Sequence, residues 1–290
     1  MTARDGTARL QQPARRAALW AALALAATVL VTLSTLYLPA GVDWHFVNRP
    51  GALALIQGQS PYEAVPNFSS PPWGVLLMAP LAVLPEALGR ALLLLLSLGA
   101  FGYAAFRLEA SPLALGAFLL SPPVLHCLLN ANLDFLVLLG FVLPPPIGMF
   151  FISVKPQVGG LVGLFWCVNA WRQDRWRGLL RVAGPIGLAY LVSFALYGFW
   201  PSHYLGVARY SQGWNSSVFP LAIPVGLALT VQALRTRQVR WVLPASVCLS
   251  PYVLFHSYSA ALIALTKNTP AMLAAVAGLW VVIVLRVLGY

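Results

Sequence analysis

The stretch PAGVDWHFVNRPGALALIQGQSPYEAVPNFSSPP, residues 39–72, decides how the rest of the chain is organised. It lies between two apolar runs, and it gathers polar side chains in a sequence that otherwise has few of them. Of the 7 acidic residues in the chain, Asp43 and Glu63 fall within it. Because a polar loop in an apolar chain is where water-facing chemistry is placed, we expect residues 39–72 to form a functional loop outside the membrane.

The composition of the 290-residue chain is that of a membrane protein. Its residues are 60% hydrophobic and only 9% charged, whereas a soluble domain carries about 25% charged residues. The apolar runs are long and continuous, which is typical of membrane-spanning helices. The formal net charge of +11 arises largely at the ends of these runs, so we attribute it to membrane orientation and expect no nucleic-acid partner. The fold class we predict is an all-α polytopic membrane protein.

Counting the apolar runs predicts roughly ten membrane segments in a single domain, residues 1–290. The basic stretch 1–16 is expected in the cytoplasm, because positively charged flanks stay on that side. Residues 39–72 and 201–219 are then the first and second outer loops. The segments we expect are 17–38, 73–84, 91–106, 112–129, 135–143, 147–171, 179–200, 220–234, 241–254, 260–265 and 271–288.

Lys155 stands inside one of these apolar runs and is followed by Pro156 and Gln157. A lysine within a span costs a few kcal/mol unless it is paired, so it is a functional candidate. Its ammonium suits a lipid phosphate, and Arg49 and Arg209 are candidate helpers. The alternative interpretation is a lysine that extends from a helix break to the membrane interface.

A second polar patch surrounds Asn130, Asn132 and Asp134. On a helix, Asn130 and Asp134 would share one face at an i, i+4 spacing; the alternative is a cluster of helix N-caps. His256 ends an apolar run, and a lone histidine there is more often structural. Asp43, taken alone, is more often a solvated loop carboxylate.

The order of these features resembles the glycosyltransferase 87 family, the polyprenol-phosphate-mannose-dependent mannosyltransferases of the GT-C superfamily. The resemblance implies a GT-C-like helical bundle with its site at the outer membrane face. It also implies a polyprenyl-phosphate sugar donor, usually a mannose donor, and inversion at the anomeric centre. The segments that carry it are GQSPYEAVPNFSSPPWGVLLMAPLAVLP (58–85), SVKPQVGGLVGLFWCVNAWRQDRWRG (153–178), GWNSS (213–217) and SPYVLFHSYSAALIAL (250–265).

By its motifs, the resemblance implies that Asp43 is the first-loop acid, Lys155 the phosphate-side lysine and His256 the late histidine. Inverting transfer needs a base for the acceptor hydroxyl and a group that stabilises the leaving phosphate. Asp43 or His256 can be the base, and the sequence does not rank them. We expect these residues to converge on one outward-facing cavity, without a metal or cofactor. Further substrate contacts are expected from Tyr62, His126, Asn130, Asn132, Asp134, Gln157, Asn215 and Tyr258.

Two other functions stay open. A transporter or lipid flippase also carries polar residues in its spans, but it should show repeated halves and polar residues near mid-membrane. An inactive GT-C-like scaffold is the third hypothesis. For the enzyme we expect a lipid or glycan acceptor, contact with membrane lipids, and a multi-pass location in a bacterial plasma membrane with the N-terminus in the cytoplasm.

Overall fold

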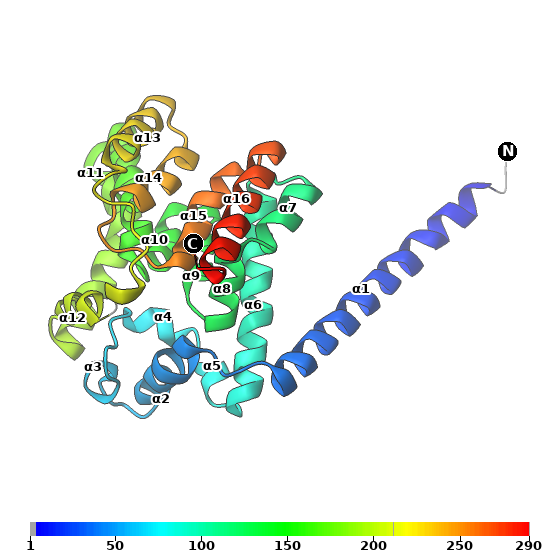
Figure 1. Ribbon diagram of the computed structural model, residues 1–290, viewed down its shortest axis with the longest axis horizontal. Coiled ribbons are helices and arrows are strands. Elements are labelled where there is room, and N and C mark those ends of the chain that lie inside the picture. The colour runs from blue at the N-terminus through cyan, green and yellow to red at the C-terminus, as the bar shows by residue number, and fades with distance from the viewer. Residues whose placement is uncertain (1–3, 211, 290) are drawn as a thin grey trace.

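The computed structural model describes residues 4–210 and 212–289, and within these ranges it is built from helices and turns without a β-strand. The first helix, α1 (Arg4–Tyr37), extends away from the body formed by the other helices (Figure 1). It is apolar and long enough to cross a membrane from Arg16 onward. Residues 4–16, expected as a polar leader, continue this helix, and residues 1–3 of that leader lie outside the described part.

Residues 39–72, the expected first outer loop, fold into short helical pieces. Helix α2 ends where Gly58 takes a φ of +72°, the left-handed conformation that favours glycine after a helix. The amide of Gln59 then donates to the Ala54 carbonyl at 2.9 Å. Trp44 and Phe68 are fully buried, so this segment is packed against the body. Its elements are the π-helical turn η1 (Trp44–Asn48), α2 (Arg49–Ile56) and α3 (Pro61–Ala64).

The structure supports four or five membrane spans where the sequence predicted roughly ten. In the described residues, 4 helices are long and apolar enough to cross: α1, α6 (Glu86–Arg107), α11 (Pro156–Tyr197) and α16 (Thr269–Val287). A fifth span results if α7 (Pro112–Leu119) and α8 (Pro122–Asn130), which meet at an angle of 51°, are taken as one broken span.

Several expected spans are shorter helices that pack inside the body. Helix α9 has 9 residues, which is about 14 Å of helix against a hydrocarbon core of about 30 Å. Hydrophobicity alone did not distinguish such buried helices from spans. The shorter helices are α4 (Pro72–Leu76), α5 (Ala79–Ala82), α9 (Asp134–Val142), α10 (Pro145–Ile152), α12 (Ser202–Tyr210), α13 (Ile223–Thr236), α14 (Val242–Leu249) and α15 (Ser259–Leu262). Short helical turns also occur at η2 (Gln212–Trp214), η3 (Val239–Trp241), η4 (Phe255–Tyr258) and η5 (Ile263–Leu265).

Proline explains where many of these helices begin. Helices α4, α7, α8, α10 and α11 each carry proline in their first turn. Proline fits there because its missing N–H would have no helical partner, yet it cannot continue a preceding helix. The proline pairs of the sequence therefore divide apolar runs into short helices and leave a turn before each new one.

Helix α11 turns back on itself at Asp174 and Arg175, where the backbone leaves helical φ/ψ values. A Cβ added at Gly178 would collide with the carbonyl oxygen of Ala170, although a straight helix would separate those residues by about 12 Å along its axis. The turn falls in the WRQDRWR stretch, residues 171–177, which we expected to separate two apolar runs.

Figure 1 shows α2, α3, α4 and α12 at one end of the body, and α13 with the upper part of α11 at the opposite end. Helix α12 lies within residues 201–219, so the expected second outer loop is partly helical, and Ser211 of that loop is outside the described residues. The end formed by α2, α3, α4 and α12 holds the site described next, and we call it the pocket end.

Candidate functional site

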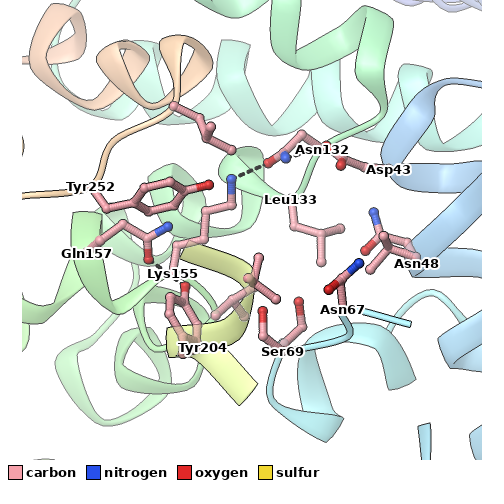
Figure 2. A pocket seen from close by; sticks show the side chains of 15 residues that line it. Asp43, Asn48, Asn67, Ser69, Asn132, Leu133, Lys155, Gln157, Tyr204 and Tyr252 are labelled. Carbon is pink, nitrogen blue, oxygen red and sulfur yellow. Dashed lines mark hydrogen bonds between the residues drawn. The ribbon is translucent and has the colours of Figure 1, made fainter. Parts of the chain in front are cut away.

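A pocket with a volume of about 120 Å³ opens at the pocket end. Figure 2 shows the side chains that line it: Asp43 and Asn132 lie near each other, and Lys155 extends from beside Gln157 and Tyr204 toward Asn132. Segments far apart in the sequence therefore meet here: the first loop, the α8–α9 turn, the α10–α11 break and α12. The lining residues are Asp43, Val47, Asn48, Asn67, Ser69, Ser70, Asn132, Leu133, Val154, Lys155, Gln157, Tyr204, Val207, Tyr252 and Leu254.

The turn between α8 and α9 places Asn132 in the pocket wall. Helix α8 ends at Asn130, Ala131 adopts the left-handed conformation (φ 55°, ψ 46°), and Asp134 begins α9. The Asn48 side chain donates to the Ala131 carbonyl at 3.1 Å, which joins the first loop to this turn. Asn130 and Asp134 therefore lie on different helices, and the predicted i, i+4 helix face is wrong. Because alanine rarely takes a positive φ, this break could not be predicted from the residue types.

Lys155 is buried at the break between α10 and α11, where Pro156 starts the new helix. Its ammonium donates to Asn132 Oδ1 and to Asp134 Oδ2 at 3.1 Å, and it lies 3.0 Å from His256 Nε2, which can accept from it when that nitrogen carries no hydrogen. An ammonium has three N–H donors, so these contacts use all of them when His256 Nε2 carries no hydrogen. The alternative of a lysine that extends to the membrane interface is wrong, because the charge is paired inside the protein.

Asp134 is the fully buried anion of this cluster. Besides Lys155, its carboxylate contacts His256 Nε2 at 3.2 Å and accepts from the Ser257 hydroxyl at 3.3 Å. Its backbone N–H donates to the Asn132 side-chain oxygen at 3.2 Å, which closes a local turn just before α9, whose N-cap residue is Leu133. Extra hydrogen bonds of this kind are what a buried ion pair needs to offset the loss of water.

Asp43 joins the cluster from the first loop. Its Oδ2 accepts from Asn132 Nδ2 at 2.5 Å, so the Asn132 amide bridges the carboxylate and the Lys155 ammonium. Burial raises the pKa of the Asp43 carboxyl above its ordinary value, against the opposing effects of the Lys155 charge and the Asn132 hydrogen bond. Asp43, Lys155 and His256 therefore belong to one cluster, in which Asn132 connects Asp43 to Lys155 and Lys155 contacts His256. Asp43 and Lys155 line the pocket, and His256 is 3% exposed and contacts the group through Lys155.

His126 and Gln157 differ in whether they line the pocket. Gln157 lines the pocket and accepts from the Tyr204 hydroxyl at 2.6 Å. His126 is exposed, and its Nδ1 lies 3.3 Å from Nδ1 of His256. The Asn130 amide donates to the His126 carbonyl at 2.9 Å, within the last turn of α8. His126 and Asn130 thus approach the buried cluster from outside the pocket lining.

Three of the expected substrate contacts stabilise the surrounding loops. The Tyr62 ring stacks on Trp200 at 5.5 Å between ring centroids, and its hydroxyl donates to the Ser70 carbonyl. Asn215 donates to the Pro251 carbonyl at 3.0 Å, and Tyr258 donates to the carbonyl of Ser216 at 2.6 Å. These contacts hold in place the loops around the pocket, and none of the three residues is among the described residues that line it.

The two arginines expected to assist Lys155 lie elsewhere. Arg49 donates to the Leu84 carbonyl at 3.4 Å, and Arg209 is exposed on α12. Neither is among the described residues that line the pocket. The positions of Arg49 and Arg209 along the sequence do not show where α2 and α12 place their side chains. The prediction that they assist Lys155 therefore had no physical basis.

Sequence reasoning missed several polar residues of the site. Asn48, Asn67, Ser69 and Ser70 belong to the first loop, whose polar density was the available signal. Tyr204, Tyr252 and Ser257 come from distant segments, and no spacing rule connects these to Asp43. In the described residues, no group of three or more His, Cys, Asp or Glu side chains is arranged to hold a metal ion.

Comparisons of the chain with protein-family models, with curated proteins and with solved structures found no match. The function is therefore argued below from the chemistry of the site.

Proposed function

We propose that the chain is a membrane glycosyltransferase that moves a sugar from a polyprenyl-phosphate donor to a hydroxyl group of a lipid or glycan acceptor. The observation that carries this proposal is the line of contacts from Asp43 through Asn132 to Lys155 along one pocket wall. It places a carboxylate and an ammonium, the two charges that inverting transfer uses, beside the same small space. Mannose is the sugar that the resemblance to glycosyltransferase 87 favours.

The remaining polar wall of the pocket suits a sugar. Amides and hydroxyls donate and accept hydrogen bonds without carrying charge, as the hydroxyl groups of a sugar do. A ligand with many hydroxyl groups can therefore be held in several directions at once. The uncharged polar residues that line the pocket are Asn48, Asn67, Ser69, Ser70, Asn132, Gln157, Tyr204 and Tyr252.

Asp43 is the better candidate for the base. It lines the pocket, and its raised pKa brings the carboxyl closer to the operating pH, where a general base works best. His256 is 3% exposed and contacts Lys155 and Asp134, so it has less access to an acceptor. In the proposed step the acceptor oxygen bonds to the anomeric carbon and its proton passes to Asp43. The bond from that carbon to the phosphate oxygen breaks, and its electron pair leaves with the phosphate.

Lys155 stabilises the leaving phosphate through its charge. It is the cationic side chain among the described residues that line the pocket, and two carboxylates, Asp43 and Asp134, lie close to it. This charge balance favours a donor with a single phosphate over a nucleoside diphosphate sugar, because diphosphate groups are usually bound by several cations or a metal. A phosphate that hydrogen-bonds directly to Lys155 must first displace one of its present partners.

A transfer assay tests the proposal. The protein in lipid nanodiscs would be incubated with radiolabelled polyprenyl-phosphate sugars and, separately, with labelled nucleotide sugars. Membrane extracts would be added to both reactions as the source of acceptor. We expect label in a glycosidic product only from the lipid donor, and loss of that product in Asp43→Asn. Turnover of a nucleotide sugar in the absence of polyprenyl phosphate would contradict the proposed donor.

A transporter or lipid flippase is the second candidate function. The observation that favours it is the buried Lys155, Asp134 and His256 network, since buried ionisable groups also mark transport paths in membrane proteins. Proteoliposomes loaded with the labelled lipid separate the two functions. A transporter moves the label across the bilayer and leaves its chemical form unchanged, whereas the enzyme forms a new glycosidic bond. An inactive scaffold does neither.

A further inference from the structure

A chain of nitrogen atoms connects the exposed side of the cluster to Lys155. His126 Nδ1 lies 3.3 Å from His256 Nδ1, and the two rings stack with 5.5 Å between their centroids. On the other side of the ring, His256 Nε2 lies 3.0 Å from Lys155 Nζ and 3.2 Å from Asp134 Oδ2. The buried imidazole thus has one nitrogen facing a histidine and the other facing both an ammonium and a carboxylate.

Two arrangements of the hydrogen atoms satisfy these contacts. A neutral imidazole carries one N–H donor and one acceptor nitrogen. In the first arrangement, His256 Nε2 accepts from Lys155 and its Nδ1–H donates to His126. In the second, His256 Nε2–H donates to Asp134 and its Nδ1 accepts from an N–H of His126. Lys155 keeps three acceptors in the first arrangement and loses one in the second.

We propose that His126 is a positioning residue whose protonation selects the second arrangement and so frees one N–H of Lys155 for a phosphate oxygen in the pocket. A protonated imidazole is a donor at both nitrogens, so its Nδ1–H requires a bare Nδ1 on His256. His126 takes up one proton from water, and His256 still carries one proton, now on Nε2. Because Nε2 of His256 then carries a hydrogen, it has no lone pair to accept from Lys155. The ammonium can donate that N–H to a new acceptor.

The surroundings of His126 allow it to respond to pH. The residue is exposed, so its ring can take up a proton from water, and partial burial of the ring lowers the pKa of His126 below its ordinary value. The charged groups that face it are Asp43 before η1, Asp134 on α9 and Lys155 before α11. Its other ring neighbours are His256 and Phe255 of η4, with Asn130 on its own helix. The cluster can therefore adopt either of two hydrogen-bond arrangements, and the proton that selects between them binds the exposed ring of His126.

The tautomer of His256 can be measured without an activity assay. The chain has 4 histidines, so protein labelled with ¹⁵N-histidine in nanodiscs gives few resonances to assign. We expect the Nε2 resonance of His256 to move from the unprotonated range at alkaline pH to the protonated range at acid pH, as His126 titrates. In His126→Gln, which does not titrate, the His256 tautomer should stay constant. His203→Gln, an exposed histidine on α12, is the matched control and should leave the switch unchanged.

A tautomer of His256 that stays constant in the unmutated protein while His126 titrates would overturn the switch, and so would a switch that persists in His126→Gln. The first of these readings needs no variant, so a folding defect in His126→Gln does not weaken the test.

The phosphate part of the inference rests on the proposed function and has a separate readout. Below the His126 pKa, the unmutated protein should bind a short-chain polyprenyl phosphate about tenfold to a hundredfold more tightly than the His126→Gln variant binds it at the same pH. This difference corresponds to one charge-assisted hydrogen bond. Above that pKa the two proteins should bind alike. Equal affinities of the two proteins for the polyprenyl phosphate at acid pH would overturn the coupling to phosphate. A failure of the sugar-transfer assay alone would contradict the proposed function and would not change the tautomer or the affinity measurement.

Discussion

Two ion pairs of nearly equal length lie at opposite ends of the body. Lys155 and Asp134 approach to 3.1 Å at the pocket end, with side-chain exposures of 11% and 0%. Arg181 and Asp174 approach to 3.2 Å at the turn of α11, with exposures of 71% and 46%. The distances are alike and the surroundings differ. The comparison teaches that burial, and not contact distance, decides which charges of this chain are costly to disturb.

The surrounding residues differ in the same way. At the pocket end Asn132, His256 and Ser257 supply further hydrogen bonds to the buried pair. At the other end, which we call the basic end, exposed arginines accumulate, and their contacts lie at the surface, such as Arg181 with Asp174 and Arg240 with the Trp241 ring. The arginines of the α11 turn and the end of α13 are Arg172, Arg175, Arg177, Arg181, Arg235, Arg237 and Arg240. We therefore expect the charges of the pocket end to act as one coupled unit and those of the basic end to act separately.

The largest effect is expected from Asp43→Asn. It removes the proposed base and keeps the size of the side chain and its contact with Asn132, so transfer should fall by about 10²–10⁴-fold. Initial rates with a labelled polyprenyl-phosphate sugar would measure the loss. Glu63→Gln, which changes an exposed acid of the same loop, is the matched control and should keep its rate. Full activity of the Asp43→Asn protein would remove Asp43 from the mechanism.

The second prediction compares the two ion pairs directly. Lys155→Met leaves the Asp134 carboxylate buried without its cation and should lower the free energy of unfolding by about 3–5 kcal/mol. Arg181→Met removes the exposed partner of Asp174 and should cost about 0–1 kcal/mol. Denaturant titrations in the same detergent would measure both. Losses of similar size in the two variants would show that burial does not separate the two ends. A second substitution, Asp134→Leu, should recover part of the Lys155→Met loss.

The third prediction concerns the pH dependence that Asp43 contributes. A base must be ionised, so the rate should fall about tenfold for each pH unit below the raised pKa of Asp43. Stability should move the opposite way. Because the folded-state pKa lies above the unfolded value of about 3.9, the stabilising contribution is full below that value and is lost as pH rises through the folded-state pKa.

Asp43→Asn isolates both effects. The variant has no titrating group at this position, so its residual rate should lack the acid limb that Asp43 produces. Relative to this variant, the unmutated protein should become less stable as pH rises through the Asp43 pKa. Unfolding free energies and initial rates across the same pH series provide the two curves. If the rate of the Asp43→Asn variant still falls at acid pH, the titrating group is another residue.

The sequence predicted the kind of fold and part of the site, for reasons that particular residues make clear. The apolar character of α1 and α6 and the turn at 171–177 were visible because they depend on hydrophobicity and charge over many residues. We expected Asp43, Lys155 and His256 in one cavity because they fall near the ends of apolar runs; Asp43 and Lys155 line the pocket, and His256 contacts Lys155 behind that lining. Ala131 is the counterexample, since a single positive φ separated Asn130 from Asp134. Contacts such as Ser257 with Asp134 depend on the packing of η4 against α8 and α9, which one sequence does not reveal.

The smallest effects are expected at the basic end, and they test whether its charges act separately. Arg172 donates to the Leu234 carbonyl at 3.2 Å and so ties the α11 turn to the end of α13. Arg172→Gln should lower the free energy of unfolding by about 0.5–1.5 kcal/mol, the net worth of one hydrogen bond. Arg237→Gln, an exposed arginine just after α13, should change it by less than about 0.5 kcal/mol. The double variant should show the sum of the two values, because independent sites add. Deviation from that sum by more than about 0.5 kcal/mol would mean that these arginines form a coupled network, and the contrast with the pocket end would then rest on burial alone.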